Sequence, residues 1–260
     1  MTIDISDAKT YPPDAVKIIL SYFRRLPQTI TSKIQTNVIR YDIDVRCAIE
    51  DYVGPFKAAA LYEEVISIFE QYELICYHST KMLDKNMVLS EGLKTNEWDS
   101  YSEDIISTFK QLGLNEDDLI LAMECIKHQY DFKYSSIGMG SQICFYSDLD
   151  LIDMEDSAGY EQFCENIGGE TARWALKEQH PELYKYLKEN GEAFIVKFKL
   201  PFSDMVDFDK ECIVYQFIAY VAGMYFWNYN YSVHFDSKTK TCIPPNNILE
   251  IIPYTKEIDY

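Results

Sequence analysis

The chain has 260 residues, and 24 Lys and Arg against 42 Asp and Glu give it a formal net charge of −18. Apolar residues make up 47% and charged residues 25%, which is the composition of a folded globular protein and excludes a chain that is disordered throughout. The excess of acid argues against general binding to nucleic acid or to anionic membranes, because such binding needs Lys and Arg facing phosphate, although a local basic patch stays compatible with it.

The first part of the chain is predicted to be mainly helical. Helices are expected over residues 15–26, with apolar residues at helical spacing and a stop at Pro27, and over residues 57–72. Residues 33–53 are ambiguous, because part of this segment alternates as a strand does. We place a boundary near residue 72, with a single domain as the alternative.

The remainder, residues 73–260, is predicted to consist of strands separated by helices. Strands are expected over residues 73–81, 141–148, 192–202, 230–236 and 247–254. Helices are expected over residues 82–93, 102–131 and 170–190. Two segments stay open, 158–169 as helix or turn and 212–229 as helix or strand. This order indicates an α+β fold with a helical N-terminal extension over residues 1–72 and a helical insertion over residues 102–131.

The cysteines and the hydropathy pattern bear on the compartment. No segment reaches the roughly 18 consecutive apolar residues of a membrane span, and the first residues lack the pattern of a signal peptide. The seven cysteines form no CxxC pair and are odd in number, which favours reduced thiols over disulfides or a zinc site. We therefore expect a cytoplasmic protein with no bound metal and no membrane partner.

The most informative segment is ELICYHSTKMLDKNMVLSEGL, residues 73–93. His78 and Thr80 stand near the end of a predicted strand, and a short helix and a Gly-Leu pair follow. These residues resemble the first motif of the ADP-ribosyltransferase superfamily, whose first core strand often ends in His-x-Thr or His-Gly-Thr. Tyr77 precedes the histidine, as in DarT-like members of that superfamily.

Later segments extend the resemblance over residues 73–254. The strand QICFYS, with Tyr146 near its end, is similar to the second motif, and AGYEQFCENIGGE (158–170) resembles the helix that follows it. The segments EAFIVKFKLPFSDMVDF and CIPPNNILEIIPY look like the later core strands. The resemblance implies a small mixed or antiparallel β core of the ADP-ribosyltransferase type.

The same resemblance implies NAD⁺ as a substrate and assigns roles to individual residues. His78 would hydrogen-bond a ribose hydroxyl, Thr80 would support it, and Tyr146 would supply a flat face for the nicotinamide ring. Tyr77 and Arg173 would contact the cofactor, and Arg173 would pair with Glu170 or with a pyrophosphate.

The sequence departs from the superfamily at its third motif. A catalytic Glu usually begins a late strand there, but the matching segment, NYSVHFD (230–236), begins without one. Glu170 is the best substitute, because Gly168 and Gly169 let the backbone approach a ligand and the start of a helix favours a negative charge. The predicted catalytic residues are therefore His78, Tyr146 and Glu170.

Each of these residues also has an ordinary structural interpretation. His78 resembles a structural strand histidine, Thr80 an N-cap of the next helix, and Tyr146 a core tyrosine. Gly168 and Gly169 could end one helix and begin another, with Glu170 as a first-turn acid and Arg173 as its surface partner. What favours the functional interpretation is that the motifs occur together and in order.

Two classes of function follow. The first is an NAD-dependent ADP-ribosyltransferase with a protein or nucleic-acid acceptor, of a size that suits a toxin or defence factor. The second is an acidic, non-enzymatic interaction protein of the immunity or nucleic-acid-mimic type, which blocks a basic partner. A third possibility is a decayed transferase that binds a nucleotide without turnover. Convergence of His78, Tyr146 and one Glu in a cleft would favour the enzyme.

Overall fold

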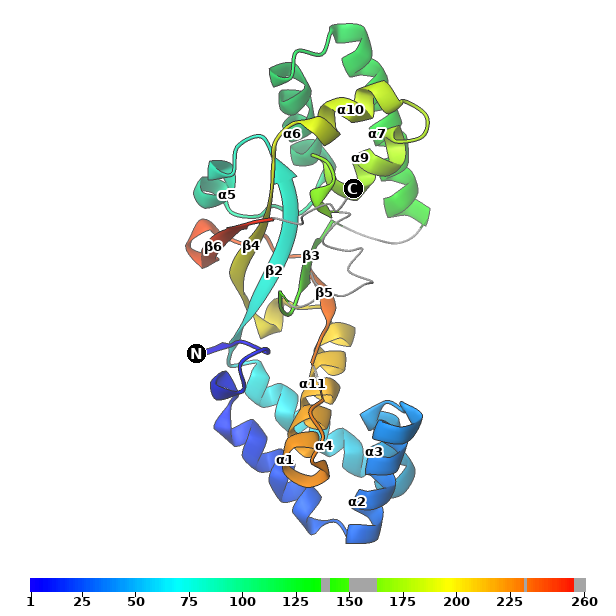
Figure 1. Ribbon diagram of the computed structural model, residues 1–260, viewed down its shortest axis with the longest axis vertical. Helices are drawn as coiled ribbons and strands as arrows, with labels where there is room; N and C mark the ends of the chain where they lie inside the picture. Colours follow the sequence, from blue (N-terminus) through cyan, green and yellow to red (C-terminus); the bar gives the residue numbers. More distant parts are fainter. Residues whose placement is uncertain (137–140, 150–162, 232, 255–260) are drawn as a thin grey trace. The chain divides into compact units, whose positions relative to one another are not determined.

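The computed structural model describes residues 1–136, 141–149, 163–231 and 233–254. Contacts between Cα atoms divide the chain into two compact units. Unit 1 combines residues 1–75 with residues 200–237, and unit 2 combines residues 76–199 with residues 238–260. Unit 1 is mainly helical, and unit 2 holds most of a six-stranded sheet together with further helices (Figure 1). The protein is therefore a mixed α+β protein.

Unit 1 is built from helices that bury aromatic side chains. Its main elements are β1 (Thr2–Ile3), α1 (Pro13–Arg25), α2 (Gln28–Gln35), α3 (Val45–Val53), α4 (Pro55–Phe69) and α11 (Asp207–Ala222), with short helical turns η1 (Ala8–Thr10), η2 (Thr36–Arg40), η4 (Phe202–Asp204) and η5 (Gly223–Trp227). Helices α1, α4 and α11 lie side by side (Figure 1). The Phe69 ring of α4 meets Phe202 and Phe217 edge-on, at centroid distances of 5.3 and 5.0 Å. These T-shaped contacts fix how α11 packs against α4.

Helix α1 confirms the periodicity predicted for residues 15–26. It buries Ala15, Ile19 and Phe23, which are four residues apart and so share one face. A proline at its first position supplies a preset φ, and the helix ends at Arg25, just before Pro27. The open segment 212–229 is also helical, because α11 and η5 cover most of it.

The strand-like alternation in residues 33–53 does not form a strand. The segment continues from α2 through η2 into α3. Its apolar side chains do not form one buried row, since Val38 and Val45 are buried but Tyr41 is 59% exposed. Asp44 instead begins α3, where its carboxylate accepts a hydrogen bond of 2.7 Å from the Arg46 backbone N–H. An N-cap and a short irregular apolar pattern thus override the apparent alternation.

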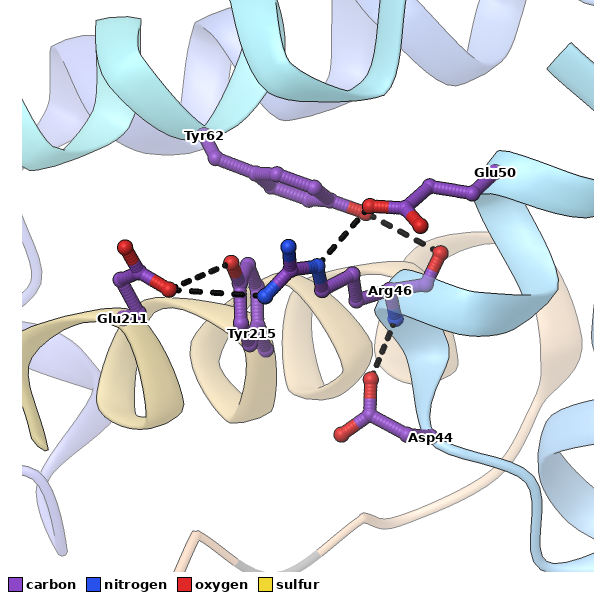
Figure 2. Close-up of polar contacts among 6 residues, drawn as sticks. All are labelled: Asp44, Arg46, Glu50, Tyr62, Glu211 and Tyr215. Atoms are coloured by element: carbon purple, nitrogen blue, oxygen red, sulfur yellow. Dashed lines mark hydrogen bonds and ion pairs between the residues drawn. The ribbon is translucent and has the colours of Figure 1, made fainter. Parts of the chain in front are cut away.

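Arg46 joins three helices of unit 1 in a polar network (Figure 2). Its guanidinium pairs with Glu50 at 2.8 Å and with Glu211 at 3.4 Å, and it lies 5.2 Å from the centre of the Tyr215 ring. Tyr215 donates to the same Glu211 carboxylate at 3.2 Å. Tyr62 of α4 contacts Tyr215 edge-on and donates to the Arg46 carbonyl at 3.4 Å. The network ties α3, α4 and α11 together at one point.

The sheet has the strand order β5-β3-β2-β4-β6. Its strands are β2 (Glu73–Met82), β3 (Ile143–Tyr146), β4 (Glu192–Pro201), β5 (Asp236–Thr239) and β6 (Ile248–Pro253). β3 runs antiparallel to β2, and β6 runs antiparallel to β4. Within unit 1, β1 pairs in parallel with the first residues of β2. The strands predicted over 73–81, 141–148, 192–202 and 247–254 are confirmed as β2, β3, β4 and β6.

The strand predicted over residues 230–236 is wrong in its placement. β5 begins only at Asp236, and the described residues from 230 to 235 belong to no strand. Val233 and Phe235 are nevertheless buried. Alternating burial of side chains therefore does not by itself identify a strand.

The helices of unit 2 are α5 (Asn86–Glu91), α6 (Trp98–Gln111), α7 (Glu116–Ser136), α9 (Gly169–Leu176) and α10 (Pro181–Glu189). Helices α6, α7, α9 and α10 gather beyond the end at which β2 finishes (Figure 1). They share an apolar core that includes Phe109, Ile126 and Leu176. No described helix is both long and apolar enough to span a bilayer.

Gly92 ends α5, and it has a second role. Its φ is +80°, a left-handed value that favours glycine. A Cβ at this position would lie 1.9 Å from the carbonyl oxygen of Ile243. The Leu93 N–H donates to that same carbonyl at 2.9 Å. Glycine is therefore required for the segment after α5 to dock against the segment before β6.

Candidate functional site

Unit 2 contains a cavity of about 360 Å³ at the end of β2. Its wall comes from β2, β3, α5, α6, the end of α7 and the start of α9. The polar side chains in this wall include His78, Thr80, Asp104, Lys133, Gln142 and Glu170. The cavity thus joins residues of the first predicted motif to the predicted catalytic acid.

His78 is held in one tautomer by a backbone carbonyl. Its Nδ1 lies 2.7 Å from the carbonyl oxygen of Cys144 on β3. A carbonyl can only accept, so Nδ1 carries the proton and Nε2 of the neutral ring is an acceptor. Burial lowers the pKa of His78, and the bond to Cys144 opposes this only in part. The neutral ring therefore prevails at pH 7, and its Nε2 is suited to accept a hydrogen bond from a hydroxyl.

Thr80 lies inside β2 rather than at the start of the next helix. Its strand continues to Met82, and the residue that precedes α5 is Lys85. The carboxylate of Asp84 accepts from the Asn86 N–H at 2.8 Å, which is the capping role considered for Thr80. The N-cap interpretation of Thr80 is thus wrong, and Thr80 lines the cavity beside His78.

Glu170 is paired with a lysine that the sequence did not single out. Its Oε2 lies 2.5 Å from Nζ of Lys133, and the two side chains are only 22% and 14% exposed. The Lys133 ammonium also lies 5.7 Å from the centre of the Trp174 ring. Glu170 stands in the first turn of α9, where the helix dipole favours its negative charge. The cavity therefore holds a partly buried carboxylate that is balanced by one cation.

The two glycines before Glu170 serve different purposes. Gly168 has φ +84°, and a Cβ there would lie 2.6 Å from Ile105 Cδ1 and 2.9 Å from Ala172 Cβ. The Tyr101 hydroxyl donates to the Gly168 carbonyl at 2.8 Å. Gly168 thus permits close packing within the protein. A Cβ added at Gly169 would have no described atom within 4 Å, so close approach of a ligand is sterically open only at this second glycine.

Tyr146 and Tyr77 lie on the other face of the sheet. They are directly opposite each other on β3 and β2, and cross-strand partners share a face. His78 follows Tyr77 in the strand and so points to the opposite face. Lys197 of β4 lies 5.6 Å from the centre of the Tyr77 ring, on the face of the two tyrosines. Neither tyrosine is among the residues that line the cavity, so the structure does not bring Tyr146 together with His78.

Arg173 is held by a different carboxylate from the one expected. Its Nε lies 3.0 Å from Glu165, which also pairs with Lys177 at 3.1 Å and with Lys188 at 3.6 Å. Burial raises the pKa of Glu165, but these cations outweigh it and leave the pKa below its usual value. Arg173 does not line the cavity, so neither its expected pairing with Glu170 nor a place beside His78 is observed.

Sequence reasoning missed Lys133 because the helix was predicted to end at residue 131. α7 extends to Ser136, and this added turn carries Lys133 to the cavity. The open segment 158–169 lies partly outside the described part of the chain, which omits residues 158–162. Within the described residues, no group of three or more His, Cys, Asp or Glu side chains is placed to hold a metal ion.

Comparisons with protein-family models, curated proteins and solved structures give no match to this chain. The resemblance to ADP-ribosyltransferases therefore stays an expectation that rests on the short sequence motifs.

Proposed function

We propose that unit 2 is an NAD-dependent ADP-ribosyltransferase-like enzyme with its reaction centre in the cavity at the end of β2. One observation carries the proposal. His78 and Thr80, selected from the first motif, and Glu170, selected as the substitute for the missing catalytic acid, line the same cavity although Glu170 is far from the other two in the sequence. The strands β2, β3, β4 and β6 would then form the β core of that superfamily.

Of the groups that the chemistry requires, the cavity offers a carboxylate and hydrogen-bonding partners for the ribose hydroxyls. The bond between nicotinamide nitrogen and ribose C1′ breaks, its electron pair leaves with nicotinamide, and positive charge builds on the ribose. A carboxylate beside that charge stabilises it, and we assign this role to Glu170, one of the four acids that line the cavity with His78. His78 Nε2 accepts from a ribose hydroxyl, and the Thr80 hydroxyl is beside it. The acceptor then bonds to C1′ and releases its proton.

The acceptor is a protein or a nucleic acid. The charge of −18 favours a protein acceptor, or a nucleic acid that meets only a local basic patch. None of the seven cysteines, all of which lie in the described part of the chain, forms a disulfide, which suits a reducing compartment such as the cytoplasm. The size suits a toxin or a defence factor.

The test is nicotinamide release from NAD⁺ by the purified full chain. Wild type is expected to release nicotinamide, and His78→Ala and Glu170→Gln are expected to lower the rate by at least about 100-fold, the usual effect of losing one stabilising group. Asp131→Asn is the matched control, because Asp131 pairs with a lysine of the same helix, Lys127, but does not line the cavity. Tyr146→Leu is expected to keep activity, because Tyr146 lies on the other face of the sheet.

The alternative functions appear as distinct outcomes of this experiment. Wild type that releases no nicotinamide, but is stabilised against heat by NAD⁺, would be a nucleotide-binding protein without turnover. Wild type that neither turns over nor binds NAD⁺ would contradict the proposal. The charge of −18 would then favour an acidic interaction protein, and basic proteins would be the partners to screen.

A further inference from the structure

The cavity has three lysines among its described lining residues, and they differ in what they contact. Lys94 is 42% exposed and pairs with Glu91. Lys81 donates a hydrogen bond to the backbone carbonyl of Lys188. Lys133 is only 14% exposed and has the carboxylate of Glu170 as its partner. Of these lysines, Lys133 is thus the one that shares a contact with the predicted catalytic acid.

The surroundings of Lys133 keep its charge close to the cavity. The ammonium lies 5.7 Å from the centre of the Trp174 ring, a distance at which the ring attracts a cation. A lysine ammonium is a point charge with three donors on a flexible stem. It can therefore exchange one nearby oxygen partner for another.

The charge balance of the cavity sets a condition on any anionic ligand. The described lining residues include four acids, Asp84, Glu91, Asp104 and Glu170, against the three lysines. A dinucleotide brings a pyrophosphate, which adds negative charge to an already acidic wall. Lys81 donates to a backbone carbonyl, whereas Lys94 and Lys133 are each paired with a carboxylate, so a pyrophosphate that engages either of these two competes with that carboxylate. Arg173, expected from the sequence to meet the pyrophosphate, is engaged by Glu165 and does not line the cavity.

We propose that Lys133 is the phosphate-binding residue of this site and that it exchanges partners. Without ligand it neutralises Glu170. When a pyrophosphate-bearing ligand enters, the ammonium turns to the phosphate oxygens, whose greater charge outcompetes one carboxylate. Glu170 is then released as a free anion beside the ribose. This inference rests on the proposed function for the nature of the ligand, but the exchange itself is a property of the ion pair.

The test measures binding of inorganic pyrophosphate to the purified full chain by calorimetry at fixed ionic strength. Wild type is expected to bind it, and Lys133→Met is expected to weaken binding about tenfold or more, as the loss of a charge-assisted hydrogen bond does. Lys133→Arg keeps a cation and is expected to bind. Glu170→Gln removes the competing carboxylate and is expected to bind several-fold more tightly. Lys127→Met is the matched control, because Lys127 lies in α7, pairs with Asp131 and contacts Trp98, but is not in the cavity wall.

The outcomes separate this inference from the proposed enzyme. Equal pyrophosphate binding by wild type and Lys133→Met, or none by wild type, would overturn the inference, and NAD⁺ turnover by wild type would still support the transferase. Binding that depends on Lys133 in a protein without NAD⁺ turnover would support the phosphate site and remove the transferase. Weaker binding by Glu170→Gln would refute the exchange. If Lys133→Met does not fold, Lys133→Arg and Glu170→Gln decide.

Discussion

The two glycines before Glu170 allow a paired test of which one is required by close packing. Gly168→Ala and Gly169→Ala place the same methyl group at adjacent positions, with φ of +84° and +61°. Both changes put a non-glycine residue at positive φ, which costs about 1–2 kcal/mol. Both also restrict the unfolded chain, which offsets this by about 0.4–1 kcal/mol. These two contributions therefore cancel in the comparison.

The packing around the two positions is what differs. At Gly168 the new methyl would lie 2.9 Å from the Ala172 Cβ, which has no rotamer to change, and 2.6 Å from the buried Ile105 side chain. At Gly169 it would meet no described atom within 4 Å. Overpacking of this kind costs about 1–3 kcal/mol. Gly168→Ala is therefore expected to lower the free energy of unfolding by about 1–3 kcal/mol more than Gly169→Ala.

The assay is urea unfolding followed by tryptophan fluorescence. A Trp227→Phe background leaves Trp98 and Trp174, both in unit 2, as the reporters. The urea dependence of the unfolding free energy should be the same in both variants, so that the midpoints report stability alone. Equal destabilisation by the two substitutions would refute the argument that Gly168 is required by close packing against α6 and α9.

Three further predictions concern other parts of the chain. Burial holds the pKa of His78 below its value of about 6.5 in the unfolded chain, so the stability that the neutral ring contributes is present above that pH and is lost as the pH falls. His78→Asn should therefore reduce the loss of unfolding free energy between about pH 6.5 and the lower pKa of the folded protein. An unchanged slope of unfolding free energy against pH would contradict this. Asn115→Ala should cost about 1 kcal/mol in urea unfolding, because the Asn115 side chain accepts from the Asp118 N–H at 2.9 Å, and Asn115→Asp should restore most of it. A double-mutant cycle on Arg46 and Glu50 should give a coupling below about 1 kcal/mol that shrinks with added salt, and a larger, salt-independent value would show that the pair is shielded from solvent.

Local patterns succeeded where burial follows from spacing along one element. The four-residue spacing in α1 and the apolar run of β2 identify which residues are buried without reference to any other segment. The stop at Gly92 could also be predicted, because its left-handed φ is a local property. In the segment 33–53, by contrast, the strand-like alternation competes with a helix N-cap at Asp44, and the observed structure is helical.

The candidate site depended on facts that are not local. The face on which Tyr146 lies is set by its pairing with Tyr77, and no pattern within either strand reveals that register. The partner of Arg173 is Glu165, which reaches it across the turn before α9 rather than along one helix. Lys133 lies in the cavity wall because α7 continues to Ser136, beyond residue 131, where the sequence pattern predicted its end.

The division of the chain has a consequence for the order in which the protein is made. Unit 1 needs α11, yet the ribosome completes α1 to α4 before most of unit 2 and adds α11 only afterwards. Until then Phe69 lacks the edge-on contacts that Phe202 and Phe217 supply. Helices α1 to α4 therefore expose part of their apolar surface to solvent while residues 76–199 are synthesised. A chain ended after residue 72 would keep this apolar surface exposed and would therefore be prone to aggregate.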